Sequence, residues 1–168
     1  MNHPLAAPEF LLANVSAGPD PCSLAALGDA EFVVLAFLRD FHCDRCRKQV
    51  RTLTDRYDDF RARNAAVVAV LPEPAERARR WVDRYDPPFP LLADPDGAIA
   101  DAYDQPTQLG GLGAANDFLG RLPATFVLDT RGDEPRFAWA HRGDSPRDRP
   151  PVDEVCRKLD ALRGRPEQ

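Results

Sequence analysis

The sequence predicts an α/β fold in which helices cover both faces of a mixed β-sheet. Three observations lead to this prediction. Short apolar segments alternate with amphipathic helical ones, the last two strand-type segments are joined by a short turn, and a Cys-x-x-Cys pair follows a buried-type strand. Strands separated by helices run parallel under cover on both faces. We expect all 168 residues, 1–168, to form a single domain.

The strand-type segments of the first half are short and apolar. Pro8–Leu12 is expected to form an entry strand before a turn, and Leu24–Leu27 a brief helical turn. Phe32–Leu38 is a continuous apolar run, which is typical of a central strand buried on both faces. Ala66–Leu71 repeats this pattern, so we expect it to be a second buried strand.

Helices are predicted where apolar residues recur at three- and four-residue spacing. The first runs from Cys43 to about Arg63, directly after the central strand. The second runs from Pro74 to about Tyr85, with proline at its start, where the missing N–H costs little. Gly97–Tyr103 is expected to form a short helix, and 152–162 the final amphipathic helix.

The remaining segments complete a recognisable order. Phe89–Leu92 is predicted as an edge-like strand, and the glycine-rich residues 104–120 as a mobile loop. Thr125–Leu128 and Phe137–His141 are expected to pair as antiparallel strands, and Gly143–Pro151 to form a proline-rich connector. In this order the elements describe a thioredoxin-like three-layer sandwich with a mixed central sheet and an N-terminal extension.

Composition narrows the classes of partner. A net charge of -5 argues against nucleic acid, whose phosphates favour a basic face. The apolar run 32–38 is far too short to cross a bilayer, so no membrane partner is expected. The N-terminus lacks the basic patch and apolar run of a signal peptide. We therefore expect a cytoplasmic location, where the four cysteines act as thiols or as a working redox pair.

The Cys43-Asp44-Arg45-Cys46 segment carries the predicted chemistry. A helix N-terminus stabilises a thiolate through its unpaired N–H groups and the positive end of the helix dipole. Arg45 adds positive charge there, whereas Asp40 opposes it. Because the thiolate is the nucleophile, Cys43 is predicted to attack. Cys46, one turn further on, can then attack a sulfenic acid or mixed disulfide formed on Cys43, giving a reversible disulfide.

Other interpretations of the cysteines stay open. A structural zinc would need two further ligands, and no other Cys or His pair has metal-knuckle spacing, so neither a metal nor a cofactor is expected. Two inert buried thiols are the remaining alternative. His42 either tunes or shuttles a proton, or is a partly exposed loop residue. Cys22 and Cys156 are expected to be non-catalytic, because Cys156 falls on an apolar stripe.

The segment around Pro123 gives a second, weaker signal. Pro123 directly precedes the predicted strand 125–128, and a cis bond there would turn the backbone sharply beside the thiols. Such a turn would expose backbone groups that could pair with an extended substrate. The alternative is an ordinary trans proline at the start of a strand. We expect Pro123 to lie close to Cys43 in the fold.

From about residue 8 to 163 the chain resembles the peroxiredoxin-like redoxins of the alkyl hydroperoxide reductase / thiol-specific antioxidant family. The segments that carry the resemblance are Pro8–Leu12, Phe37–Cys46, Leu91–Gly97 with Tyr103, and Pro123–Asp129. The resemblance implies a thioredoxin fold and an attacking cysteine at Cys43. It also implies reduction by a thiol donor, such as a thioredoxin-type protein or a low-molecular-weight thiol.

The chain departs from this family at three positions. Typical members have Thr or Ser three residues before the attacking cysteine, where this chain has Asp40. Further upstream Ala36 replaces their usual proline. Their arginine, which steadies thiolate and peroxide, precedes the Thr-Phe strand; Pro123 stands near that place here, with Arg121 two residues earlier. A proline there is more typical of thioredoxins and disulfide reductases.

Two enzyme functions therefore remain, both thiol-dependent oxidoreductases. A thiol peroxidase would use Cys43 to attack a peroxide, and whole-chain resemblance favours it. A thioredoxin-like thiol–disulfide oxidoreductase would use Cys43 to attack protein or small-molecule disulfides. A redox-sensing or binding protein without turnover is a third possibility. The sequence does not name the substrate or the electron donor, and it does not decide between a monomer and a homodimer.

Overall fold

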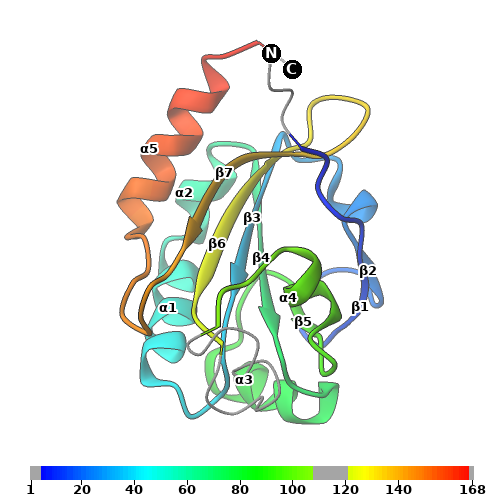
Figure 1. Ribbon diagram of the computed structural model, residues 1–168, viewed down its shortest axis with the longest axis vertical. Helices are drawn as coiled ribbons and strands as arrows, with labels where there is room; N and C mark the ends of the chain where they lie inside the picture. The colour runs from blue at the N-terminus through cyan, green and yellow to red at the C-terminus, as the bar shows by residue number, and fades with distance from the viewer. Residues whose placement is uncertain (1–4, 108–120, 167–168) are drawn as a thin grey trace.

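A computed structural model describes residues 5–107 and 121–166. Its centre is a seven-stranded mixed sheet with the order β2-β1-β5-β4-β3-β6-β7 (Figure 1). Strands β3, β4 and β5 run parallel, and the other neighbouring pairs are antiparallel. The strands are β1 (Leu11–Asn14), β2 (Cys22–Ser23), β3 (Phe32–Phe37), β4 (Ala65–Leu71), β5 (Leu91–Ala93), β6 (Ala124–Asp129) and β7 (Arg136–Arg142).

Helices cover both faces of this sheet, as the sequence predicts. The helices are α1 (Asp44–Asp55), α2 (Tyr57–Arg61), α3 (Ala75–Tyr85), α4 (Ala98–Ala102) and α5 (Val152–Arg163), with the 3-10 turn η1 (Ala25–Leu27). Side chains of α1, α2, α3 and α5 form one core layer with the sheet. The N-terminal segment, the residues before η1 and α4 form the other, and α4 lies on the front face in Figure 1. The α/β sandwich prediction is confirmed.

The central strand β3 is buried along its whole length. Phe32, Val34 and Ala36 belong to one core layer, and the residues between them belong to the other. This division follows from the alternation of side chains along a strand. An uninterrupted apolar sequence is therefore what a strand covered on both faces requires.

The structure corrects two of the predicted elements. The helix expected from Cys43 to Arg63 breaks at Arg56 into α1 and α2. Just before the break, the hydroxyls of Thr52 and Thr54 donate to main-chain carbonyls four residues earlier, an interaction that bends helices. The predicted edge-like strand, β5, is instead an inner strand, because β1 pairs with its outer side.

Three connections meet at one end of the sheet, and α1 begins at this end. Phe37 at the end of β3 pairs with Ala124 at the start of β6, and Ala124 pairs with Arg142 at the end of β7. The start of α1, the segment before β6 and the connector after β7 therefore share the lower end of the sheet in Figure 1. The predicted mobile loop lies mostly outside the described residues, at 108–120.

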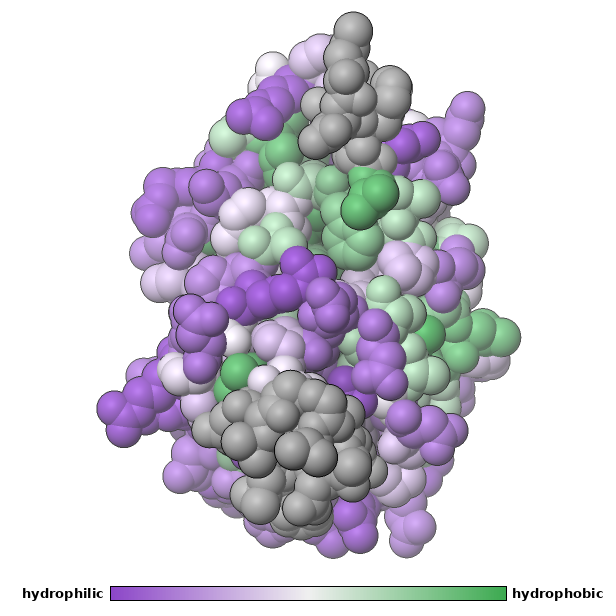
Figure 2. Space-filling view, viewed as in Figure 1, coloured by the Kyte–Doolittle hydropathy of each residue, from purple (hydrophilic) through white to green (hydrophobic). Residues whose placement is uncertain are grey.

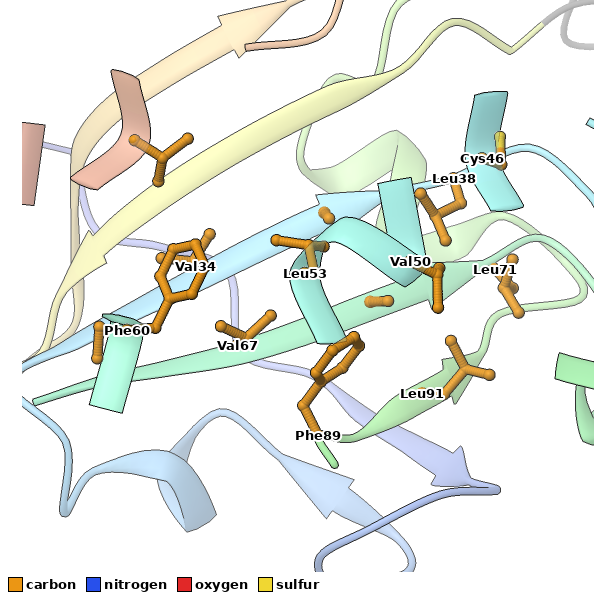
Figure 3. Packing of buried hydrophobic residues seen from close by; sticks show 14 of the residues in the cluster. Val34, Leu38, Cys46, Val50, Leu53, Phe60, Val67, Leu71, Phe89 and Leu91 are labelled. Atoms are coloured by element: carbon orange, nitrogen blue, oxygen red, sulfur yellow. The ribbon is translucent and has the colours of Figure 1, made fainter. Parts of the chain in front are cut away.

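The inner face of α1 ties this edge to the core. Figure 3 shows Cys46, Val50 and Leu53 pointing from α1 toward the sheet, with Cys46 beside Leu38. All four side chains belong to the same buried cluster. Because a close-packed core allows little displacement, it fixes the position of the first turn of α1 and of its cysteines. None of the helices in the described part of the chain is long and apolar enough to span a membrane.

Candidate active site

Cys43 is the N-cap residue of α1 and is partly exposed. Its backbone is extended, with φ -75° and ψ 103°, so that its side chain turns back over the first helical turn. The Cys43 sulfur accepts a hydrogen bond from the Cys46 N–H at 3.2 Å. A sulfur thus occupies the place that a Ser or Asp oxygen takes in an ordinary N-cap, where the free N–H groups favour negative charge.

Cys46 lies one turn inside the helix and is fully buried. Its sulfur accepts a hydrogen bond from the Arg39 N–H at 3.4 Å. Burial, followed by its hydrogen bond to Cys43, raises the pKa of Cys46 well above the ordinary value. Cys46 therefore stays protonated. Its S–H donates to the Cys43 sulfur and stabilises a negative charge there.

Arg149, from the connector before α5, brings a cation to both sulfurs. Its Nη2 donates to the Cys46 sulfur at 3.1 Å and to the Cys43 sulfur at 3.6 Å. The same guanidinium donates through Nη1 to Gln49 on α1 and through Nε to the Pro146 carbonyl. These contacts orient the guanidinium, so its charge stays next to the cysteine pair.

The surroundings of Cys43 favour its thiolate. The Cys46 side chain donates to it, which is the largest effect, and partial burial of the Cys43 sulfur opposes this. The Cys46 N–H and the charges of Arg149 and Arg39 also favour the anion, and together they lower the pKa of Cys43 to about 6. One thiolate beside one protonated, buried thiol is the arrangement that stepwise thiol chemistry needs.

A pH titration tests this difference between the two thiols. Since a lowered pKa leaves Cys43 ionised above about pH 6, thiolate absorbance at 240 nm should rise through that pH and then stay level to about pH 9. Cys43→Ser should remove the step, and Cys156→Ser should keep it. A first step above pH 8 in the wild-type protein would contradict the thiolate assignment.

The connector that carries Arg149 is anchored at its start. The Gly143 N–H donates to the Pro123 carbonyl at 2.9 Å. His141 Nε2 lies 2.8 Å from an Asp148 carboxylate oxygen, and the other Asp148 oxygen accepts the Asp144 N–H at 2.9 Å. These contacts close the connector on itself and hold Arg149 at the end of a short, fixed segment.

Pro123 directly precedes β6 and therefore lies at the same end of the sheet as Cys43. Its contacts are with Gly143 of the connector. The Leu122–Pro123 bond is trans, because the cis bond within the described residues is Asp20–Pro21. The thioredoxin-type cis turn considered for Pro123 is therefore absent, and Pro123 supports the segment that carries Arg149.

Asp40, His42 and Arg45, the modulators predicted from the sequence, lie around the Cys-x-x-Cys pair. Asp40 accepts the Cys43 N–H through its main-chain carbonyl, while its carboxylate accepts the His42 N–H at 2.8 Å. The carboxylate is thus engaged in the local turn. His42 and Arg45 are exposed, and neither has a hydrogen bond to a sulfur among the described residues.

Glu73 supports the loop before Cys43 from below. It is 7% exposed, accepts the Phe41 N–H at 3.0 Å and accepts the Trp81 indole N–H at 3.2 Å. The Phe41 and Trp81 rings meet edge to face with centroids 5.5 Å apart. This buried group fixes the approach of the chain to Cys43, and the sequence interpretation did not include it.

Arg121 lies away from the sulfurs in an ion pair of its own. It is 5% exposed and pairs with Asp101 at 3.0 Å. Its guanidinium also packs against Gly97, where an added Cβ would lie 2.2 Å from Nη2. The arginine that the resemblance places near 121 is therefore engaged at α4, and Arg149 supplies the cation at the cysteines.

Cys22 and Cys156 are both buried, and burial raises the pKa of each. Cys22 belongs to the core layer opposite the one that contains Cys46. Cys156 belongs to α5 and packs with Val155 and Leu159 as the apolar stripe predicts. In the described part of the chain, no three His, Cys, Asp or Glu side chains gather as potential metal ligands.

Sequence reasoning missed Arg149, although topology contained a signal for it. Strand β6 runs antiparallel to β3, and β7 runs antiparallel to β6, so β7 points the same way as β3. The connector after β7 therefore begins at the end of the sheet where β3 ends. Cations in that connector were therefore candidates for the thiolate site. The segment holds Arg147 and Arg149 between prolines, and its composition alone suggested only a linker.

Comparison with known proteins agrees with this geometry. The sequence profile of the AhpC/TSA family matches residues 5–133. The chain belongs to the AhpC/TSA family. The resemblance seen in the sequence is thereby confirmed, and the family match includes the Cys43–Cys46 segment and the whole of β6. The expectation of a thiol-dependent oxidoreductase agrees with this membership.

Individual relatives include both kinds of thiol protein. The chain is 28% identical over 131 residues to the thiol-disulfide oxidoreductase ResA of Oceanobacillus iheyensis, over 76% of this chain and 60% of ResA. It is 24% identical over 102 residues to the peroxiredoxin Bcp of Bacillus subtilis, over 61% of this chain and 64% of Bcp. The chain thus spans less than two thirds of either relative.

Among solved structures, the peroxidoxin BcpB of Mycobacterium tuberculosis superposes with a TM-score of 0.77. The two sequences are 21% identical, and the match covers 96% of this chain and 98% of BcpB. A 2-Cys peroxiredoxin of Plasmodium vivax gives a TM-score of 0.78 at 19% identity, over 95% of this chain and 80% of its own. These structures confirm the fold.

Proposed function

We propose that this protein is a thiol peroxidase in which Cys43 attacks the peroxide and Cys46 resolves the product. The observation that carries the proposal is the Arg149 cation held against both sulfurs, beside a Cys43 thiolate with a pKa of about 6. A positive group at that place stabilises both the thiolate and the oxygen that leaves as the peroxide bond breaks. The trans bond before Pro123 also favours the peroxidase over thioredoxin-type disulfide exchange.

The first step is a two-electron transfer from sulfur to oxygen. The Cys43 thiolate attacks the terminal oxygen of R–O–OH, an S–O bond forms and the O–O bond breaks. Cys43 becomes a sulfenic acid, and the RO⁻ group leaves as ROH after taking up a proton. Arg149 Nη2, at 3.6 Å from the Cys43 sulfur, is near enough to donate to the departing oxygen.

The second step closes a disulfide. Cys46 loses its proton and attacks the Cys43 sulfenic sulfur, and the hydroxyl leaves as water. The high pKa of Cys46 keeps it protonated until the sulfenic acid forms, so the two thiols act in sequence. Two electrons from an external thiol donor, either a thioredoxin-type protein or a low-molecular-weight thiol, restore the dithiol.

A thiol–disulfide oxidoreductase is the second candidate, and the depth of Cys46 favours it. A partly exposed attacking thiol followed by a fully buried one also suits attack on a disulfide and release by the second cysteine. The relative ResA is named as such an enzyme. In this candidate Cys43 forms a mixed disulfide with the substrate, and Cys46 displaces the reduced product.

The Cys46→Ser variant distinguishes the two candidates. In a peroxidase it should consume about one equivalent of hydrogen peroxide and stop as a Cys43 sulfenic acid, because the first attack does not need Cys46. Stopped-flow peroxide consumption and dimedone labelling with mass spectrometry measure both results. In a disulfide reductase the same variant should consume no peroxide above a free-thiol control and should trap a mixed disulfide.

Matched variants complete this test. Cys43→Ser should abolish either reaction, and Cys156→Ser should behave as the wild-type protein because Cys156 is a buried core residue of α5. A main Cys22–Cys43 or Cys43–Cys156 bridge after mild oxidation would assign the resolving role to a cysteine other than Cys46.

Buried, unbridged Cys22 and Cys156 also suit a reducing compartment, so we infer a cytoplasmic location, which cell fractionation tests.

A further inference from the structure

A cavity of about 450 Å³ lies next to the cysteine pair. It is bounded by α1, by the connector from Arg147 to Pro151 and by the start of α5, and Val34, Ala36 and Thr125 of the sheet also line it. Arg149 is part of its wall and donates to both sulfurs. Neither cysteine lines the cavity, and the Arg149 guanidinium connects its wall to the two sulfurs. Its volume falls within the range of sites for small molecules.

The charge of the cavity wall is strongly one-sided. Its lining includes one acidic residue, Asp153. Five cations also line it: Arg45, Lys48, Arg56, Arg147 and Arg149. Arg56 is neutralised by Asp153 and by Asp59. Within residues 5–107 and 121–166, the other four cations form no ion pair. A net positive cavity has thus formed on a chain whose net charge is -5.

We propose that this cavity binds a low-molecular-weight thiol that carries carboxylate groups, and that this thiol is the electron donor for Cys43 and Cys46. The proposal rests on the thiol redox function proposed above and names its reducing substrate. Guanidinium and ammonium groups on the wall match carboxylates, and arginine does so with two parallel hydrogen bonds. The apolar side chains of Val34, Leu53 and Val155 suit the hydrocarbon part of such a molecule.

A small donor fits the geometry better than a protein. The cationic groups line a concave space and Cys46 is completely buried, so the donor has to bring its thiol to Cys43. A molecule held in the cavity by its carboxylates would do this, since Arg149 is common to the cavity and to the Cys43 sulfur. Positive charge on the wall also favours the thiolate form of the donor.

The reduction balances with two molecules of donor. The thiolate of the first attacks the Cys43 sulfur, the Cys43–Cys46 bond breaks, and Cys46 leaves and takes up a proton. The thiolate of the second attacks the donor sulfur of the mixed disulfide and releases Cys43. Two donor thiols thus become one donor disulfide, and two electrons pass to the cysteine pair. Cys46 takes up one proton, and the other goes to the solvent because Cys43 is released as a thiolate.

The test measures reduction of a disulfide that diamide has formed, so that it does not depend on peroxide. Mercaptosuccinate is the anionic probe and 2-mercaptoethanol the neutral one, with the return of free thiols followed by mass spectrometry. In a Lys48→Gln/Arg147→Gln variant, the ratio of the two rate constants should fall about fivefold below the wild-type ratio, because each exposed ion pair contributes modestly. Arg51→Gln removes an exposed cation of α1 outside the cavity and should leave the ratio unchanged.

Binding without reaction provides a second readout. Titration calorimetry of mercaptosuccinate into a Cys43→Ser/Cys46→Ser variant should detect binding that weakens with added salt and with Lys48→Gln/Arg147→Gln. An unchanged rate ratio in the cavity variant, or equal binding by both proteins, would overturn the proposal. So would rapid reduction by a thioredoxin-type protein with no preference for mercaptosuccinate. Failure of the peroxide assay alone would overturn only the peroxidase function, because this measurement uses no peroxide.

Discussion

Replacing Arg149 with glutamine is expected to slow the reaction of Cys43 with hydrogen peroxide by about 100-fold at pH 7, a typical loss for one preorganised donor. The substitution removes the guanidinium that donates to both sulfurs, at 3.1 Å and 3.6 Å. Two effects add. The pKa of Cys43 rises from about 6, since Arg149 is one of the charges that lower it. The departing oxygen also loses a cation that stabilises its negative charge.

The pH dependence separates these two effects. If the pKa of Cys43 rose fully to the ordinary thiol value of about 8.5, the thiolate fraction at pH 7 would fall about 30-fold. Above about pH 9.5 both proteins would be largely thiolate, so the rate difference that persists there reports stabilisation of the leaving oxygen. Stopped-flow rates from pH 5 to 10 measure both parts. The Arg149→Lys variant should recover part of the rate, because it restores the charge without the planar fork.

Arg51→Gln is the matched control for this prediction. Arg51 is an exposed cation of α1 that has no hydrogen bond to either sulfur, so its loss should leave the pH–rate profile unchanged. Equal rates for Arg149→Gln and the wild-type protein across the pH range would remove Arg149 from the mechanism. A slow Arg149→Gln protein with an unfolding midpoint equal to that of the wild type would assign the loss to chemistry.

Replacing Gly143 with alanine is expected to cause a comparable loss of peroxide reactivity without removing any charge. A Cβ at this position would lie 2.6 Å from the Asp148 carbonyl oxygen and 3.0 Å from the Pro123 ring and carbonyl. Two of these atoms are backbone, so the connector must move away from β6, and Arg149 must move with it. We also expect the free energy of unfolding to fall by about 1–3 kcal/mol, as for other overpacked sites.

Gly164→Ala is the control for the alanine substitution itself. At Gly164 the nearest atoms to an added Cβ are 3.7 and 4.0 Å away, and the backbone has φ -75°, which alanine adopts freely. This variant should keep the wild-type unfolding midpoint in urea and the wild-type peroxide rate. If Gly143→Ala lowered stability but kept a pKa of about 6 for Cys43 and a full peroxide rate, the connector would not position Arg149.

Much of the fold follows from local patterns that need no partner. The apolar run of β3 predicted a strand covered on both faces, and it has that place because its alternate side chains enter two core layers. The sequence predicted that α1 begins at Cys43, because apolar spacing and the strand–helix order are local properties. The break at Arg56 was missed, since the spacing of Leu53, Tyr57 and Phe60 continues across it.

Strand order depends on pairing between distant segments, and there the sequence was less informative. The segment that forms β5 is short, so its composition suggested an edge, yet β1 pairs with it and makes it an inner strand. The trans bond before Pro123 was likewise undecided by the sequence, because local energy differs little between the two isomers of an X–Pro bond.

The sequence by itself identified the two candidate sulfurs, because a Cys-x-x-Cys pair between a buried strand and a helix places Cys43 at the free N–H groups of the first turn. The tertiary structure alone decided which cation serves them. Arg121 came from the segment that family resemblance favoured, but it pairs with Asp101 at α4. Arg149 lies 106 residues from Cys43 in the sequence. It reaches Cys43 because β3, β6 and β7 pair in a register that brings their connections to one end of the sheet. The electrostatic interaction between two charges weakens with distance. The strand register, which is not a local sequence pattern, therefore decides which arginine acts on the sulfurs.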